Sequence, residues 1–219
     1  MKDFFHNETN ENEGFSIDIS SADEFSEEVA EEPKKSFTKE VLEWLEIFVF
    51  AIVAVIAIFT LFFRIATIDG ASMNNTLLHG QKVIISDFNY TPKQGDIIVI
   101  SRNIENSVEA KSSADTPIIK RVIATGGQTV NIDFKTGTVY VDDVPLVENY
   151  ISSPTTNFYD VEFPKYVPEG YVFVLGDNRR VSLDSRSSQI GEDGLVDERY
   201  ILGKAYYRIL PISDAGGLY

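Results

Sequence analysis

The stretch Ile47–Phe63 reads IFVFAIVAVIAIFTLFF, and it divides the chain into a polar tail, an apolar segment and a folded domain. Its only polar side chain is that of Thr60. A helix over this stretch, rising 1.5 Å per residue, would be about 25 Å long, close to the lower limit for a membrane span. Trp44 and Leu45 extend the apolar surface at the near interface. We therefore predict a transmembrane signal-anchor helix over residues 38–64.

Two other interpretations of this stretch fit the sequence less well. A core helix of a soluble domain needs apolar segments around it, and no run of comparable length lies nearby. A cleaved signal peptide has a shorter apolar region, followed closely by a small-x-small cleavage site, and this stretch has neither feature.

The segment before the apolar stretch is strongly acidic. Residues 1–46 contain four lysines against fourteen Asp and Glu, with no sustained hydrophobic period. This composition predicts an acidic, disordered tail over residues 1–37. Lys34, Lys35 and Lys39 precede the apolar stretch, and only Arg64 closely follows it. By the positive-inside rule, the tail is cytoplasmic and residues 65–219 lie outside the membrane.

Residues 65–219 consist of short apolar runs separated by turn signals, which is typical of an all-β domain. Arg102–Asp115 has no such pattern and is expected to be a loop. About 150 residues in at least seven strands indicate one mainly β domain, an antiparallel sandwich or barrel. The predicted strands are Lys82–Ser86, Asp96–Ser101, Pro117–Ala124, Thr129–Asp133, Thr138–Val141, Tyr171–Leu175 and Ile201–Ile209.

The composition argues against several classes of function. The 219 residues carry a net charge of −15, without the basic excess of a nucleic-acid-binding protein. The chain has no cysteine, which excludes disulfides and thiolate chemistry. Its two histidines, His6 and His79, are too few for the usual His-based zinc sites. We expect no cofactor and no metal.

The segment Gly70-Ala71-Ser72-Met73-Asn74-Asn75-Thr76-Leu77 opens the folded domain and contains a candidate nucleophile, Ser72. A serine hydroxyl is a weak nucleophile at neutral pH and needs an adjacent base. His79, seven residues further on in an expected turn, is one candidate. The other candidate is a lysine kept neutral by burial, and Lys120 fits that description.

Lys120 lies in the apolar run Ile118–Ala124, beside Arg121. Successive residues of a strand point to opposite faces, so one of these two basic residues must face inward or sideways. Burial lowers the pKa of a lysine, as a lysine base requires, whereas arginine stays charged. The alternative is an edge strand on which both charges are solvated.

A third polar stretch, Gly176-Asp177-Asn178-Arg179-Arg180-Val181-Ser182-Leu183-Asp184-Ser185-Arg186, directly follows the strand Tyr171–Leu175. Such a dense group of polar residues after a core strand suits a buried, hydrogen-bonded corner. Taken alone, it fits a surface loop with Asp–Arg pairs equally well.

Together these motifs resemble the bacterial type I signal peptidases, which are membrane-anchored Ser/Lys endopeptidases. The resemblance covers about residues 40–210, with the family's motifs in the right order and spacing. The matching segments are Ser72–Leu77, Gly95–Val99, Ile119–Val122, Gly176–Arg186 and Gly203–Ala205.

The sequence departs from the family pattern at two turns. Asn75 replaces the family's proline after the nucleophile, and Thr125-Gly126-Gly127-Gln128 replaces a Pro-Gly-Asp turn. Proline fixes φ, whereas asparagine also suits turns, so we expect a looser turn at Asn75 and no loss of function. The second change is expected to affect only a turn.

The resemblance implies a role for each matching residue. Ser72 would attack the scissile carbonyl, Lys120 would act as general base and then general acid, and Ser182 would orient the lysine amine. The same corner would be supported by Asp177, Asn178, Asp184 and Arg186.

The family also implies a substrate: preproteins whose signal peptides are cleaved after a small-x-small site. Ser72 lies nine residues past Phe63, at most about 30 Å of extended chain from the membrane edge. A signal peptide presents its cleavage site just outside its own apolar segment. We expect the substrate to pair with strand edges near Ile65–Ala71 and Thr116–Ile119. The expected substrate-binding residues are Gly70, Ala71, Met73, Ile118 and Ile119.

The resemblance implies a monomeric, single-pass protein of the bacterial cytoplasmic membrane, with the catalytic domain on the extracytoplasmic side and signal peptides and the lipid bilayer as partners. Two other functions fit some of these motifs. A self-cleaving Ser/Lys repressor would carry a DNA-binding domain where this chain has its apolar stretch. A membrane-anchored β-domain that binds a partner and has lost catalysis would be consistent with Asn75.

Overall fold

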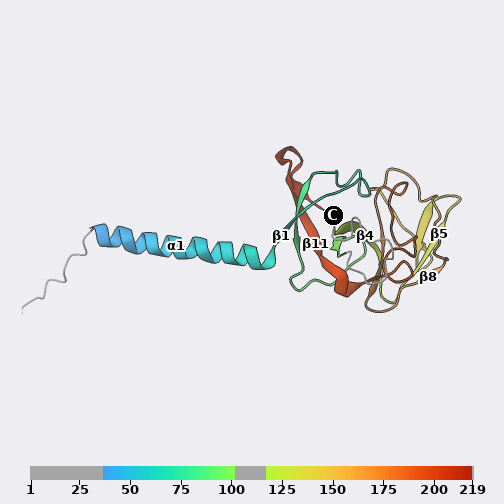
Figure 1. The fold of residues 1–219 in the computed structure, drawn as a ribbon, viewed down its shortest axis with the longest axis horizontal. Coiled ribbons are helices and arrows are strands. Elements are labelled where there is room, and N and C mark those ends of the chain that lie inside the picture. Colours follow the sequence, from blue (N-terminus) through green and yellow to red (C-terminus); the bar gives the residue numbers. More distant parts are fainter. Residues whose placement is uncertain (1–36, 102–116, 219) are drawn as a thin grey trace, which may run out of the picture. The chain divides into compact units, whose positions relative to one another are not determined.

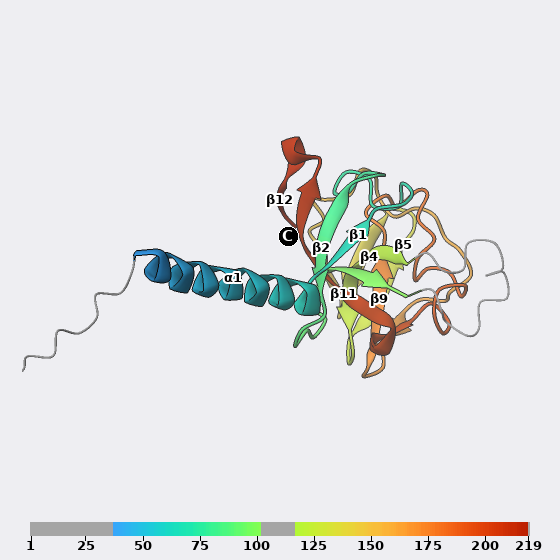
Figure 2. The ribbon, with the colours of Figure 1, turned by 60° about the vertical axis from the view of Figure 1, so that its left-hand side comes forward.

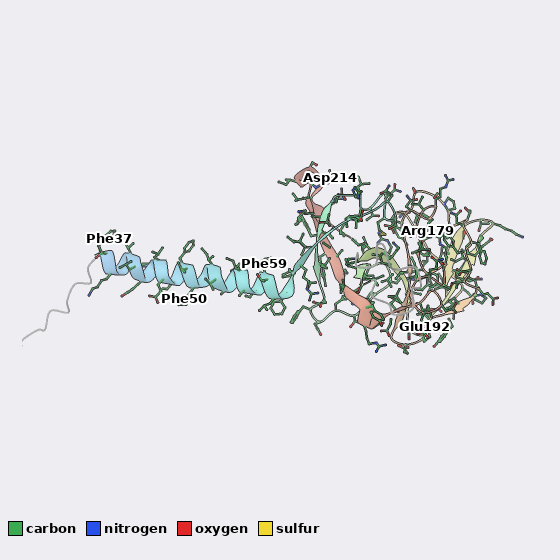
Figure 3. All side chains as sticks on the ribbon, viewed as in Figure 1. Phe37, Phe50, Phe59, Arg179, Glu192 and Asp214 are labelled. Carbon is green, nitrogen blue, oxygen red and sulfur yellow. The ribbon has the colours of Figure 1, made fainter. Side chains whose placement is uncertain are left out.

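The computed structural model describes residues 37–101 and 117–218. The predicted acidic tail, apart from Phe37, and the predicted loop Arg102–Asp115 lie outside the described residues. Helix α1 spans Phe37–Phe62, and none of its residues is buried. Its labelled phenylalanines Phe37, Phe50 and Phe59 project from the helix surface (Figure 3). The helix is long and apolar enough to cross a membrane, with a mean hydropathy of 2.8 over its most apolar window. These properties favour a membrane span over the core-helix alternative.

The β domain contains two antiparallel sheets. The larger sheet has the strand order β1-β2-β11-β3-β4-β9-β10, with β12 paired to β11 (Figure 2). The smaller sheet has the order β7-β6-β5-β8, and β5 and β8 lie on the side of the β domain away from β1 and β11 (Figure 1). The strands are β1 (Arg64–Thr67), β2 (Lys82–Ser86), β3 (Ile97–Ile100), β4 (Ile118–Thr125), β5 (Thr129–Asp133), β6 (Thr138–Val141), β7 (Val144–Pro145), β8 (Lys165–Tyr166), β9 (Tyr171–Leu175), β10 (Val196–Asp197), β11 (Ile201–Leu210) and β12 (Gly216–Gly217).

The central strands of the larger sheet are buried on both faces. In β3, Ile97 and Val99 pack into one apolar cluster, while Ile98 and Ile100 pack into another. This arrangement follows from the alternation of side chains along a strand whose residues are all apolar. A third cluster joins the smaller sheet to β4 and β9. These clusters hold β3, β4 and β9 as a rigid platform for the residues that follow them.

The predicted strands correspond to β2, β3, β4, β5, β6, β9 and β11, with shifts of one residue at some ends. The prediction of a mainly β, antiparallel domain is confirmed. The strands β7, β8, β10 and β12 were not predicted, because two residues are too few to show a period of two. Strand β1 was not predicted either: the helix ends at Phe62, and Arg64, which we expected to be helical, begins β1.

The topology brings together three segments that are distant in sequence. The candidate nucleophile lies between β1 and β2, Lys120 lies on β4, and the polar corner beginning at Gly176 directly follows β9. Strands β4 and β9 are neighbours in the sheet. The corner therefore begins beside the strand that carries Lys120.

Candidate active site

Lys120 and Arg121 are both buried, with 3% and 1% of their surfaces exposed. Strand β4 is paired with β3 on one side and β9 on the other. The alternative of an edge strand with two solvated charges is therefore wrong. The Lys120 Nζ lies 2.9 Å from the Ser72 Oγ and also donates to the Ile119 carbonyl at 3.1 Å. The predicted base and nucleophile are thus in direct contact.

Ser72 lies in a hydrogen-bonded turn that two apolar side chains attach to the core. Met73 and Leu77 are buried in the same apolar cluster. The Met73 carbonyl accepts hydrogen bonds from the amides of Thr76 and Leu77, at 3.1 and 2.8 Å. The buried side chains and the backbone hydrogen bonds together hold Ser72 in place.

Asn75, which replaces the family's proline, has a φ of +89°. Proline holds φ near −65°, so proline at this position would require a different backbone conformation. Asparagine tolerates the left-handed region better than most residues. The Thr76 amide, directly after Asn75, is hydrogen-bonded to Met73, and the Thr76 carbonyl accepts from Arg208 Nη1 at 3.0 Å. The residue after Asn75 is therefore hydrogen-bonded through both its amide and its carbonyl.

The polar corner after β9 binds the backbone of the nucleophile segment. The Asn178 amide donates to the Ser72 carbonyl at 2.9 Å, and the Asn178 side chain donates to the Ala71 carbonyl at 3.1 Å. A Cβ placed on Gly176 would lie 2.5 Å from that same Ser72 carbonyl and 2.2 Å from the Ser182 Oγ. Only glycine at position 176 allows the Ser72 carbonyl and the Ser182 side chain to approach this closely.

Ser182 is fully buried, and its Oγ has no hydrogen-bond partner among the described residues. The hydrogen bond to Lys120 implied by the family resemblance is not formed in this structure. A buried hydroxyl without a partner costs about 1–3 kcal/mol, and such groups need an explanation. The side chain lies against Gly176, as the Ser72 carbonyl does. Ser182 is therefore an unsatisfied polar group next to the candidate catalytic pair.

Asp184 and Arg186 form the ion pair that the resemblance implies, and both side chains are fully buried. Arg186 donates to both carboxylate oxygens, at 2.8 and 2.9 Å. The Gly176 amide donates to Asp184 at 3.0 Å, and Arg186 also binds the Ser182 carbonyl at 3.2 Å. The ion pair thus connects Gly176, the first residue of the corner, to Arg186, its last residue.

Asp177 is paired with Arg121, the residue next to Lys120. The Arg121 guanidinium binds Asp177 at 2.9 and 2.7 Å and donates to the Gly95 carbonyl at 2.7 Å. The hydroxyl of Thr76 also donates to Asp177. Asp177 therefore links the nucleophile turn to β4. Neither Thr76 nor Arg121 was assigned a role from the sequence, although both lie inside the matching motifs.

His79 does not occupy the position of a base. Its imidazole is mostly exposed, its Nδ1 accepts from the Gly70 amide at 3.2 Å, and it lies 3.3 Å from Asp69. The Ser72 hydroxyl contacts Lys120 instead. The described residues contain no group of three or more His, Cys, Asp or Glu side chains suited to a metal ion.

The expected substrate-binding residues divide between two environments. Met73 and Ile119 pack into one apolar cluster, whereas Ile118 packs against a different one. Gly70 and Ala71 are exposed beside the nucleophile. Side chains from Met73 and Ile119 can therefore line a common surface, but the side chain of Ile118 is not part of it.

Comparison with known proteins gives consistent results. Residues 41–210 match the family "Signal peptidase, peptidase S26". A probable signal peptidase I-2 of Synechocystis sp. is 34% identical, over 86% of this chain and 83% of its own. A signal peptidase I of Bacillus licheniformis is 28% identical, over 85% of this chain and 97% of its own. A crystal structure of a signal peptidase I from Enterococcus faecalis is 29% identical, with a TM-score of 0.38, over 52% of this chain and 97% of that one. The chain belongs to the signal peptidase family, peptidase S26.

Proposed function

We propose that Ser72 and Lys120 form the catalytic dyad with which this chain cleaves signal peptides from exported preproteins, after a small-x-small site such as Ala-x-Ala. Membership of the family makes the chain a serine endopeptidase that removes signal peptides. The observation that carries the assignment of residues is the 2.9 Å contact between Lys120 Nζ and Ser72 Oγ, on a lysine that is 3% exposed.

Burial favours the neutral amine that a lysine base needs, because the charged ammonium loses its hydration. Neutral Lys120 takes the proton of Ser72 while the serine oxygen attacks the scissile carbonyl. The tetrahedral intermediate collapses, Lys120 returns the proton to the leaving amine, and an acyl-enzyme remains. Lys120 then deprotonates a water that attacks the ester, and protonates Ser72 as the signal peptide leaves. No cofactor takes part.

Ser182 is proposed to orient the amine of Lys120. Its unsatisfied, buried hydroxyl supports this role, because a side-chain rotation that gives it the amine as partner would remove the cost of leaving it unpaired. The oxyanion would be held by the backbone N–H of Ser72. Gly70 has no side chain that could supply a second donor.

The substrate is proposed to bind as an added strand along Ile118–Lys120. Strand β9 pairs with β4 from Arg121 to Thr125. That register begins at Arg121, next to Lys120, so an extended peptide along Ile118–Lys120 would continue the sheet beside the candidate dyad. Met73 and Ile119 would contribute the apolar surface that selects small side chains.

We propose that α1 anchors the chain in the bacterial cytoplasmic membrane as a single span. Its length and hydropathy support this role. The N-terminus would be cytoplasmic and the β domain extracytoplasmic, since the lysines precede the helix and only Arg64 follows closely. The active protein would be a monomer.

The test is cleavage of a preprotein with an Ala-x-Ala site by the detergent-solubilised chain. Wild type and the control Lys135→Ala, which changes an exposed lysine, are expected to cleave after the final alanine. Ser72→Ala and Lys120→Ala are expected to be inactive. Full activity of Lys120→Ala would refute the proposed base. Binding of the preprotein without cleavage by folded wild type would favour the partner-binding alternative.

A further inference from the structure

The connection between β7 and β8 contacts the back of the active-site corner, although it lies outside every motif discussed above. Three of its polar residues, Glu148, Tyr150 and Thr155, turn inward. The side chain of Glu148 is 6% exposed, and Thr155 is fully buried. A carboxylate that is almost completely removed from water needs a specific partner. Its partner is a second buried charge.

Glu148 forms a two-pronged ion pair with Arg179, whose side chain is 1% exposed. Arg179 Nη1 donates to Glu148 Oε2 at 3.0 Å, and Nη2 donates to Oε1. The hydroxyl of Thr155 contacts the same guanidinium. Because both acceptor oxygens are used, the carboxylate determines the orientation of the guanidinium as well as its charge balance.

Arg179 in turn holds the corner. Its Nε donates to the Gly176 carbonyl at 3.0 Å, and its own carbonyl accepts from Arg186 at 2.9 Å. Gly176 lies against the Ser72 carbonyl, to which the Asn178 amide donates. Glu148 thus orients Arg179, Arg179 binds the first residue of the corner, and Asn178, two residues further on, binds the carbonyl of the nucleophile.

Tyr150 connects the same segment to the other side of the site. Its hydroxyl donates to Glu148 Oε1 at 2.9 Å, and its ring lies 4.0 Å from the guanidinium carbon of Arg121. Arg121 binds Asp177, which in turn accepts from Thr76 in the nucleophile turn. Burial, with the nearby Glu148 charge, raises the pKa of Tyr150, so the hydroxyl remains a donor at neutral pH.

We infer that Glu148 and Tyr150 are positioning residues for the Ser72–Lys120 pair, acting through Arg179 and Arg121. The inference rests on the proposed function of Ser72 as nucleophile. Neither residue contacts the reacting atoms, and neither lies on the β4 edge assigned to the substrate. Their loss should therefore lower kcat and leave KM nearly unchanged.

The test compares Glu148→Gln with Glu162→Gln in the full-length protein. Glutamine keeps the size of Glu148 but loses its charge and one of its two acceptor oxygens. Glu162 is an exposed glutamate in the same connection and serves as the matched control. With an Ala-x-Ala peptide, E148Q is expected to lower kcat about tenfold or more and to change KM less than about twofold, since small displacements of reacting groups mainly affect the chemical step. E162Q should behave like wild type.

Tyr150 provides a second, independent pair of variants. Tyr150→Phe keeps the ring over Arg121 and loses only the bond to Glu148, whereas Tyr150→Leu loses both contacts. We expect kcat to fall in the order wild type, Y150F, Y150L. If folded E148Q and Y150L both retain wild-type kcat, and only the temperature of unfolding falls, the two residues are merely structural and the inference is wrong.

Amide hydrogen exchange separates failure of the inference from failure of the proposed function. If wild type does not cleave the peptide, the proposed function fails. The positioning of residues 71–77 can still be measured. Faster exchange of this segment in E148Q or Y150L than in E162Q supports the inference, and equal exchange in all the variants overturns it.

Discussion

Replacing Gly176 with alanine should displace the nucleophile by a distance that the structure specifies. The added Cβ would lie 2.5 Å from the Ser72 carbonyl oxygen, where an ordinary contact is at least 3.4 Å. The Ser182 side chain, with its Oγ at 2.2 Å from the new Cβ, can rotate away. The Ser72 carbonyl is backbone, held by the Asn178 amide, and it would have to move by about 1 Å.

The size of the expected effect follows from that displacement. Misplacing a reacting group by about 1 Å can lower the rate about 100-fold, which corresponds to about 2.7 kcal/mol in the activation barrier. Overpacking a buried site destabilises the fold by about 1–3 kcal/mol. We therefore expect Gly176→Ala to fold, to unfold at a lower temperature, and to cleave about 100-fold more slowly.

The assay measures kcat for a preprotein or peptide with an Ala-x-Ala site, together with the temperature of unfolding. Gly216→Ala is the control, since a Cβ at Gly216 would meet its nearest neighbour, the Asp214 carbonyl, at 4.0 Å. If Gly176→Ala cleaves within roughly twofold of wild type, the contact between the corner and Ser72 does not determine the position of the nucleophile, and the reasoning is refuted.

Three further predictions concern the fold around the site. Asn75→Pro should lower the free energy of unfolding by about 1–3 kcal/mol, because proline cannot adopt the φ of +89°, whereas Asn75→Gly should be tolerated in the same denaturant titration. Asp184→Asn should cost about 3–5 kcal/mol, because it leaves the fully buried Arg186 without its counter-charge. Its control, Asp197→Asn in a pair with the same spacing whose arginine is 83% exposed, should change stability less. Burial and the hydrogen bond to a carboxylate raise the pKa of Tyr90 above its ordinary 10.0. The unfolded chain therefore loses this proton first, and stability should be retained below about pH 10 and fall above it, less steeply in Tyr90→Phe.

The long apolar helix and the strands could be predicted from the sequence because both depend on local patterns. The run Ile47–Phe63 is apolar at every position but Thr60, and the strands at Lys82–Ser86 and Thr129–Asp133 coincide with their predicted bounds. Lys120 was a candidate base because a basic residue inside an apolar strand must be buried or on an edge. The resemblance to family motifs then indicated that the stretches containing Ser72, Lys120 and Gly176–Arg186 belong to one site.

Tertiary structure decided the remaining features, because they join residues far apart in the chain. The hydroxyl of Thr76 meets Asp177 across a separation of 101 residues, and the last long strand, β11, inserts between β2 and β3. The ion pair of Glu148 with Arg179 could not be inferred, since no local period specifies which charges share a buried site. Side-chain alternation along a strand is set by its own residues. Pairing order and buried ion pairs are set by the packing of the whole domain, and in this protein that packing brings Lys120 to Ser72.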